Sequence, residues 1–178
     1  MATLKGGDKI EKILKQIGDK ASGGVNVGFL SGATYPDGTS VAQVAFWNEY
    51  GHGGNFPAPA RPAFRQMIEK ESAGWPEKMA KGLEYYNYDA AKMFAAMGDN
   101  IKGALQESIS NFDGVALSPT TLMLRKQFGN NPQNIRLSDV LEAQRLVAAG
   151  EEGASGTQGK PLVWTGHMLA SVDFEVFP

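Results

Sequence analysis

Apolar residues recur at intervals of three or four over much of the chain, a spacing that predicts amphipathic helices. Between Ile10 and Ile17, apolar residues follow this spacing among Lys, Glu and Gln. In Val25–Phe29, apolar residues instead alternate with small or polar ones, which predicts a half-buried strand ahead of a turn at residues 36–38. Ser40 is a suitable N-cap for a further helix, and Gly51 is a suitable end for it.

The middle of the chain carries the strongest helical pattern. After a loop rich in Gly and Pro at residues 51–60, a helix is expected to begin near Arg61-Pro62, to break at residues 74–76 and to continue to Tyr88. From Ala90 to Phe112, apolar residues again recur at spacings of three and four. This pattern predicts a helix of about five to six turns that packs along its length.

The C-terminal third predicts two shorter helices, a loop and a strand. Ser118-Pro119 combines an N-cap with proline at the first helical position, so a helix is expected from there to Gly129. Residues 138–150 repeat the helical pattern, whereas the glycine-rich residues 151–160 have little to bury and predict a flexible loop. Val172–Phe177 alternates as a terminal strand does.

Together these elements predict a single α+β domain over residues 1–178. We expect a small, mostly antiparallel sheet packed with helices, and a helical elaboration at about residues 75–150. The sequence contains neither an internal repeat nor a clear linker, which favours one domain.

The composition is that of a folded protein with little net charge. Hydrophobic residues make up 42 % of the chain, and 17 Lys and Arg against 19 Asp and Glu give a formal charge of -2. This balance differs from the basic surface of a protein that holds nucleic acid by its phosphates. The chain has no Cys, which excludes disulfides and thiolate metal sites. Because no apolar run suits a membrane span or a signal peptide, we expect folding in a cytoplasm and no membrane partner.

The motifs of common enzymes are missing from the sequence. Neither His52 nor His167 has the spacing of a metal site, and no phosphate-binding glycine motif is present. His52-Gly53-Gly54 resembles the oxyanion loop of some esterases, but the Gly-x-Ser-x-Gly motif that should accompany it is absent. Glu49, Asp37 and the pair at residues 151–152 are scattered acids, which we interpret as solvated surface. We therefore expect no enzyme, and we assign no catalytic residue, cofactor or metal ligand.

Arg61 is the most distinctive charged residue. It lies between Ala60 and Pro62 in a proline-stiffened segment, and Arg65 follows one turn later. A guanidinium on such a segment loses little backbone entropy when it binds, which suits a contact between subunits. An ordinary structural salt bridge is the alternative.

Two pairs of motifs resemble a known family. Residues 41–51, which end in Asn48-Glu49-Tyr50-Gly51, and residues 56–65, which contain Ala60-Arg61-Pro62, resemble the signature of bacteriophage virion-morphogenesis, neck and head-tail joining proteins. Residues 117–122 and the segment from Pro161 to Val176 are similar to the second half of that family's pattern. The order and approximate spacing agree.

The resemblance implies a structural role: a neck or tail-completion ring in the head-tail connector of a tailed phage. Its partners would be further copies of the chain, in six- or twelvefold symmetry, and neighbouring connector or tail proteins, while DNA passes through without specific binding. The expected location is the virion, at the neck or the top of the tail. A tail terminator ring and a small hydrolase are the alternatives. The expected subunit interface comprises Tyr50, Phe56, Arg61, Phe64, Arg65 and Trp164.

Overall fold

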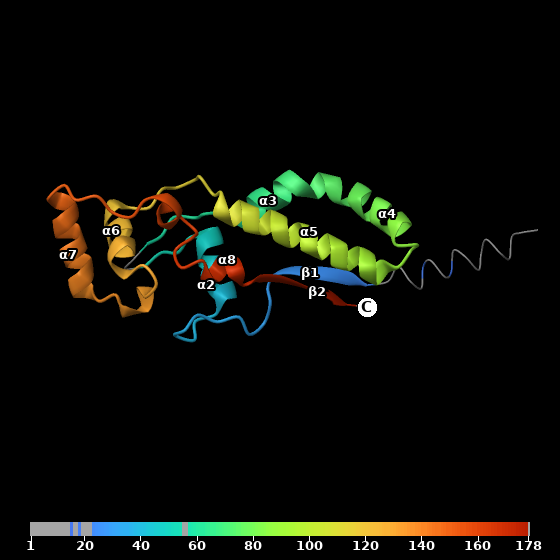
Figure 1. Cartoon of the computed structure of the whole chain (residues 1–178), viewed down its shortest axis with the longest axis horizontal. Helices are drawn as coiled ribbons and strands as arrows, with labels where there is room; N and C mark the ends of the chain where they lie inside the picture. Colours follow the sequence, from blue (N-terminus) through green and yellow to red (C-terminus); the bar gives the residue numbers. More distant parts are fainter. Residues whose placement is uncertain (1–14, 16–17, 19–22, 55–56, 178) are drawn as a thin grey trace, which may run out of the picture.

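A computed structural model describes Lys15, Gly18, residues 23–54 and residues 57–177 of the chain. The helix expected at residues 10–17 and the expected interface residue Phe56 lie outside the described residues, apart from Lys15. The described molecule is elongated, with a small sheet and long helices towards one end and two shorter helices at the other (Figure 1). None of the helices described there is both long and apolar enough to cross a bilayer.

The two predicted strands pair with each other although they lie at opposite ends of the sequence. β1 (Gly24–Phe29) runs antiparallel to β2 (Val172–Phe177), with Gly24 opposite Phe177 and Phe29 opposite Val172. The chain is mainly helical and has this one small antiparallel sheet in its described part, so the α+β class is confirmed.

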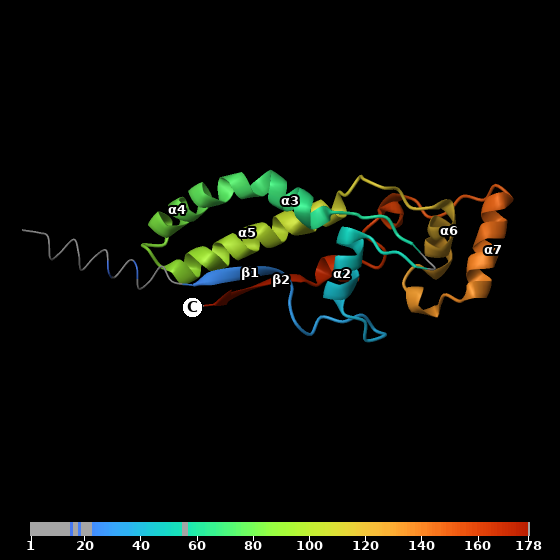
Figure 2. The same ribbon diagram turned by 180° about the vertical axis from the view of Figure 1, so that it is seen from behind.

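The long predicted helix lies along the sheet. α5 (Ala90–Ser110) forms the middle of three layers, between the sheet and the helices α3 (Ala63–Glu71) and α4 (Trp75–Tyr85) (Figure 2). Gly98 permits the close approach of α5 to the strands, because a Cβ there would lie 2.8 Å from Val25 and closer still to the ring of Phe174.

The interruption predicted at residues 74–76 is present. A 3-10 turn, η1 (Ser72–Gly74), separates α3 from α4, and Pro76 lies in the first turn of α4. α4 ends at Tyr85 rather than at the expected Tyr88, because Asn87 and Tyr88 adopt positive φ angles of 52° and 63° in the turn that leads to α5.

The main core lies where α2 (Val41–Tyr50) and the short α8 (His167–Ala170) meet the C-terminal half of α5. Leu105 and Ile109 of α5 are buried here against Val41 and Val172. Ser40 caps α2 as predicted, since its side chain accepts a hydrogen bond from the backbone N–H of Gln43.

A separate helical pair forms the other end of the molecule. α6 (Pro119–Phe128) and α7 (Leu137–Ala148) pack on each other around Met123 and Ala143, with 3-10 turns at η2 (Pro132–Asn134) and η3 (Gly156–Gly159). The helical elaboration expected at residues 75–150 is thus divided. α5 belongs to the main core, whereas α6 and α7 form a separate hydrophobic cluster.

The glycine-rich segment 151–160 is mostly exposed and runs alongside α6. The backbone N–H of Ala154 donates to the Leu122 carbonyl at 2.8 Å, and the Lys126 Nζ donates to the Glu152 carbonyl at 2.9 Å. These contacts attach the segment to the helical pair. Its mobility in the free subunit stays a prediction.

Candidate functional site

Glu49, near the end of α2, organises the segment that the sequence marks as an interface. The residue is 6 % exposed, and its carboxylate accepts hydrogen bonds from the backbone N–H groups of Phe64 at 3.0 Å and Arg65 at 3.1 Å. These are first-turn N–H groups of α3, a helix whose own N-cap residue, Pro62, offers no side-chain cap. Glu49 therefore acts as the cap of α3, and its interpretation as solvated surface is wrong.

Arg65 completes this arrangement from the outer side. Its Nε donates to the Glu49 carboxylate at 2.9 Å and its Nη2 to the Glu49 backbone carbonyl at 2.8 Å. The guanidinium lies over the ring of Tyr50, 5.0 Å from its centroid. Two of the expected interface residues, Tyr50 and Arg65, thus form one ordered unit with Glu49.

The loop between α2 and α3 is closed by backbone contacts. His52 and Ala58 exchange hydrogen bonds at 3.0 and 2.9 Å, and the Arg61 N–H donates to the Asn48 carbonyl at 2.6 Å. Gly51 has a φ of 73°, and a Cβ there would lie 2.8 Å from the Ala58 carbonyl oxygen. Glycine is therefore required at the end of α2, and the two motifs on either side of the loop form one structural unit.

The outer side of α2 is a row of aromatic side chains, which we name the α2 aromatic face: Phe46, Trp47 and Tyr50. They are 59 %, 39 % and 58 % exposed, and the rings of Phe46 and Tyr50 contact each other at 4.7 Å between centroids. On its inner side the same helix buries Val41 and Ala45 in the main core. α2 is thus apolar on both sides, which is typical of a helix covered on both sides.

The other expected interface residues are more deeply placed. Phe64 is partly buried, 5.6 Å from the ring of Phe29. Arg61 is 8 % exposed, its Nε donates to the Val115 carbonyl at 3.4 Å, and burial lowers its pKa. The structural salt bridge considered for Arg61 is not among the ion pairs of the described residues. Trp164 lies in a groove on another side of α2.

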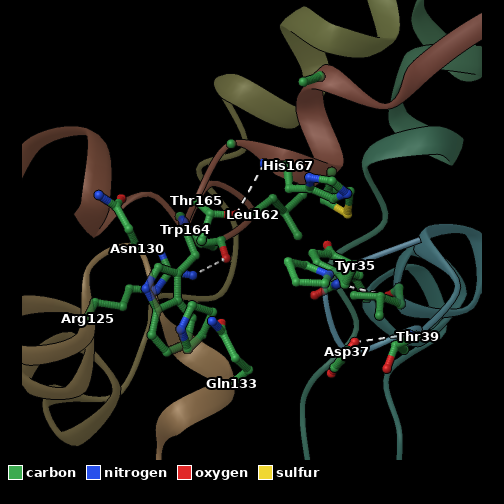
Figure 3. A pocket seen from close by; sticks show the side chains of 18 residues that line it. Tyr35, Asp37, Thr39, Arg125, Asn130, Gln133, Leu162, Trp164, Thr165 and His167 are labelled. Carbon is green, nitrogen blue, oxygen red and sulfur yellow. Dashed lines mark hydrogen bonds between the residues drawn. The ribbon is translucent and has the colours of Figure 1, made fainter. Parts of the chain in front are cut away.

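This groove has a volume of about 840 Å³ and lies between the main core and the helical pair (Figure 3). One wall comes from the connection between β1 and α2, where Asp37 accepts a hydrogen bond from the Thr39 N–H at 2.9 Å. That hydrogen bond lowers the pKa of Asp37, whereas burial, and then the charge of Asp37, raises the pKa of Tyr35. The remaining lining residues are Pro36, Val44, Asn48, Arg125, Asn130, Pro132, Gln133, Pro161, Leu162, Trp164, Thr165, Gly166, His167, Met168 and Ala170.

Arg125 of α6 is the central charged residue of the opposite wall. It is 4 % exposed, and its Nη1 donates to the carbonyls of Gln158, Lys160 and Val163 at 2.8, 2.7 and 2.9 Å, while its Nη2 donates to that of Pro161 at 3.0 Å. Burial, and then the nearby Arg61, lower the pKa of Arg125 to about 10, so it remains a cation at neutral pH.

Two donors in this wall have no partner. The guanidinium carbon of Arg125 lies 5.0 Å from the centre of the Trp164 ring, and neither the Arg125 Nε nor the Trp164 Nε1 has a hydrogen-bond acceptor. Sequence reasoning selected Trp164 but missed Arg125. A basic residue in the last turn of a helix is normally solvated, and the only local signal is its place directly after Leu122-Met123-Leu124.

Each of the two histidine rings contacts a backbone carbonyl oxygen. The His167 Nε2 is 2.9 Å from the Thr34 carbonyl oxygen, and the His52 Nδ1 is 3.2 Å from that of Gly53, so each ring bonds to backbone rather than to a hydroxyl. The described residues contain no cluster of His, Cys, Asp and Glu that could hold a metal ion. That the chain is not an enzyme stays a prediction.

Comparisons of the chain with family models, with curated proteins and with solved structures found no match.

Proposed function

We propose that this chain is a structural subunit of the head-tail connector of a tailed bacteriophage, in which copies form a closed ring around the DNA path. The family-like motifs of the sequence and the geometry of the α2–α3 region support this role together. The two N-terminal motifs meet at Glu49, which connects them by capping α3. A segment held in this way is suited to present side chains to a neighbour.

The observation that carries the proposal is the α2 aromatic face. Aromatic residues and Arg are enriched in protein interfaces, and Trp, Tyr and Arg are enriched among the few residues that supply most of the binding energy. Here Phe46 and Tyr50 are more than half exposed, and Arg65 lies over Tyr50 with its guanidinium fixed by Glu49. A side chain that is already ordered loses less entropy on binding. We therefore place one side of the subunit contact at this face.

A ring subunit needs a second, different surface, because head-to-tail contacts are heterologous. α7 offers one at the opposite end of the molecule from the sheet (Figure 1). Leu137 and Leu141 lie one helical turn apart on α7, and both are well exposed. In the proposed ring, an apolar surface of this kind on one copy covers the α2 aromatic face of the next.

The charge of the chain is compatible with a DNA conduit. With a formal charge of -2, the chain has no excess of basic residues that would retain DNA by its phosphates, and in the proposed ring the duplex passes without specific binding. The tail terminator ring remains the second candidate, because it needs the same two-sided subunit and differs only in its place on the tail.

The test is the morphology of particles made without this protein. Electron microscopy should show filled heads separated from tails, and a plasmid copy of the gene should restore joined virions. Complementation with Phe46→Ser/Tyr50→Ser should fail, whereas complementation with the control Tyr85→Ser, which changes an exposed aromatic residue on α4, should succeed. Tails of abnormal length would favour the terminator. Infectious virions without the protein would end the proposal.

A further inference from the structure

We propose that the groove between the main core and the helical pair binds a peptide segment that carries a carboxylate, and that it holds this carboxylate at Arg125 and Trp164. The inference concerns a surface distinct from the α2 aromatic face, and it does not depend on the phage connector role. It rests on an uncompensated buried charge, on two unpartnered donors and on the lining of the groove.

The charge of Arg125 is not balanced. Its four hydrogen bonds go to neutral backbone carbonyls, and the ion pairs of the described residues include neither Arg125 nor Arg61. Both arginines are more than nine-tenths buried, and their charges repel each other. Buried charges are normally paired, because leaving water is costly for an ion. An anion that enters the groove would supply the missing charge.

The unpartnered donors indicate where this anion binds. The Arg125 Nε–H and the Trp164 Nε1–H belong to stacked side chains that both line the groove. A carboxylate has two acceptor oxygens and can take one hydrogen bond from each donor. Because both nitrogen atoms are covered by their surroundings, side chains of this wall have to move when the ligand enters.

The charge distribution favours a single carboxylate over a phosphate. Figure 3 shows Arg125 and Trp164 on one side of the groove and Asp37 on the other. The negative charge of Asp37 disfavours a dianion in the same groove. The two unpartnered buried donors match the two oxygens of a carboxylate, whereas a phosphate presents more acceptor oxygens.

The rest of the lining suits a peptide. The side chains of Asn130 and Gln133 on the rim each offer both a donor and an acceptor, as peptide groups require. Leu162 and Met168 provide apolar surface between the two walls. A volume of about 840 Å³ is large enough for a short extended segment.

Nuclear magnetic resonance on the unaltered protein tests the proposal, because the indole N–H of Trp164 gives a separate signal. The probe is acetyl-Leu-Glu-Leu-amide, and the matched control is acetyl-Leu-Gln-Leu-amide. We expect the Glu peptide to shift the Trp164 indole signal in a saturable way and to bind about tenfold or more tightly than the Gln peptide. The signals of Trp47 and Trp75 should stay in place.

Trp164→Phe removes one donor but keeps an aromatic ring. It should weaken binding of the Glu peptide, measured by isothermal titration calorimetry, about tenfold, whereas Trp47→Phe should leave it unchanged. Arg125→Met, which removes the charge, should abolish the preference for Glu over Gln. If either variant fails to fold, the comparison of the two peptides on the unaltered protein decides alone. Equal binding of both peptides, saturable binding of inorganic phosphate in place of the Glu peptide, or no shift of the Trp164 signal at millimolar peptide would each overturn the proposal.

Discussion

At the scale of single residues, the charged side chain of Glu49 has a structural role, because it caps α3. A buried carboxylate is costly unless it is hydrogen-bonded, and Glu49 accepts two backbone N–H groups and the Arg65 Nε–H. Removing it leaves first-turn N–H groups of α3 without an acceptor in a partly buried setting. Removing Arg65 leaves Glu49 still bonded to both backbone groups, and the Arg65 side chain is 55 % exposed.

We predict that Glu49→Ala lowers the free energy of unfolding by about 2 to 4 kcal/mol, because a buried acceptor of several hydrogen bonds is lost. Arg65→Ala should cost only about 0.5 to 1 kcal/mol, because its ion pair is screened by water. Urea unfolding followed by circular dichroism measures both. Equal losses for the two variants would mean that the capping of α3 is not the main role of Glu49.

The sequence could not reveal this role, because the partners of Glu49 lie 15 and 16 residues further along the chain. The caps that were predicted, Ser40 and Ser118, act within three residues of themselves and can be recognised locally. Arg125 was missed for the same reason, since the carbonyls that surround it come from residues 158–163. Some residues of the candidate site have a role that depends on contacts with distant parts of the chain. The sequence predicts such residues only where they lie in a recognisable motif.

At the scale of elements, local patterns determined most of the fold. Strands β1 and β2 were predicted by alternation, and α2, α5 and α6 by caps and apolar spacing. The pairing of β1 with β2 and the position of α5 along this sheet depend on contacts between distant segments. Gly98 marks the contact between α5 and the strands, and Gly103 in the same helix has open space around it.

These two glycines allow a matched comparison. Gly98→Ala should destabilise the protein by about 1 to 3 kcal/mol, because the added Cβ overlaps the side chains of Val25 and Phe174. Gly103→Ala should instead stabilise it by about 0.5 to 1 kcal/mol, because alanine favours the helix and meets no neighbour. Thermal unfolding of both variants checks the signs. A stabilising Gly98→Ala would contradict the packing of α5 on the sheet.

A further prediction concerns the attachment of residues 151–160 to α6. Because the Ala154 N–H is bonded to the Leu122 carbonyl, its hydrogen exchange should be at least about tenfold slower than that of the exposed Ser155 N–H in the free protein. Residue-resolved amide exchange measures the difference. Exchange of Ala154 as fast as that of Ser155 would show that the segment leaves α6 in solution, and would support the mobility expected from its glycine content.

At the scale of the whole molecule, a subunit of the proposed ring has its α2 aromatic face covered by a neighbouring copy. A small protein rarely leaves three aromatic side chains together in water, and here they lie on a helix whose other side holds the main core. The exposed leucines of α7 give the subunit a second apolar surface, on a different part of the molecule. A subunit with two such surfaces can form a closed ring.

Native mass spectrometry of the purified protein over a range of concentrations tests this claim most directly. We expect a closed assembly of six or twelve copies, its loss to monomer in Phe46→Ser/Tyr50→Ser, and its retention in the control Tyr85→Ser. Circular dichroism should show that all three proteins are folded. A protein that stays monomeric at every concentration, or an α2 variant that assembles as the unaltered chain does, would contradict the account.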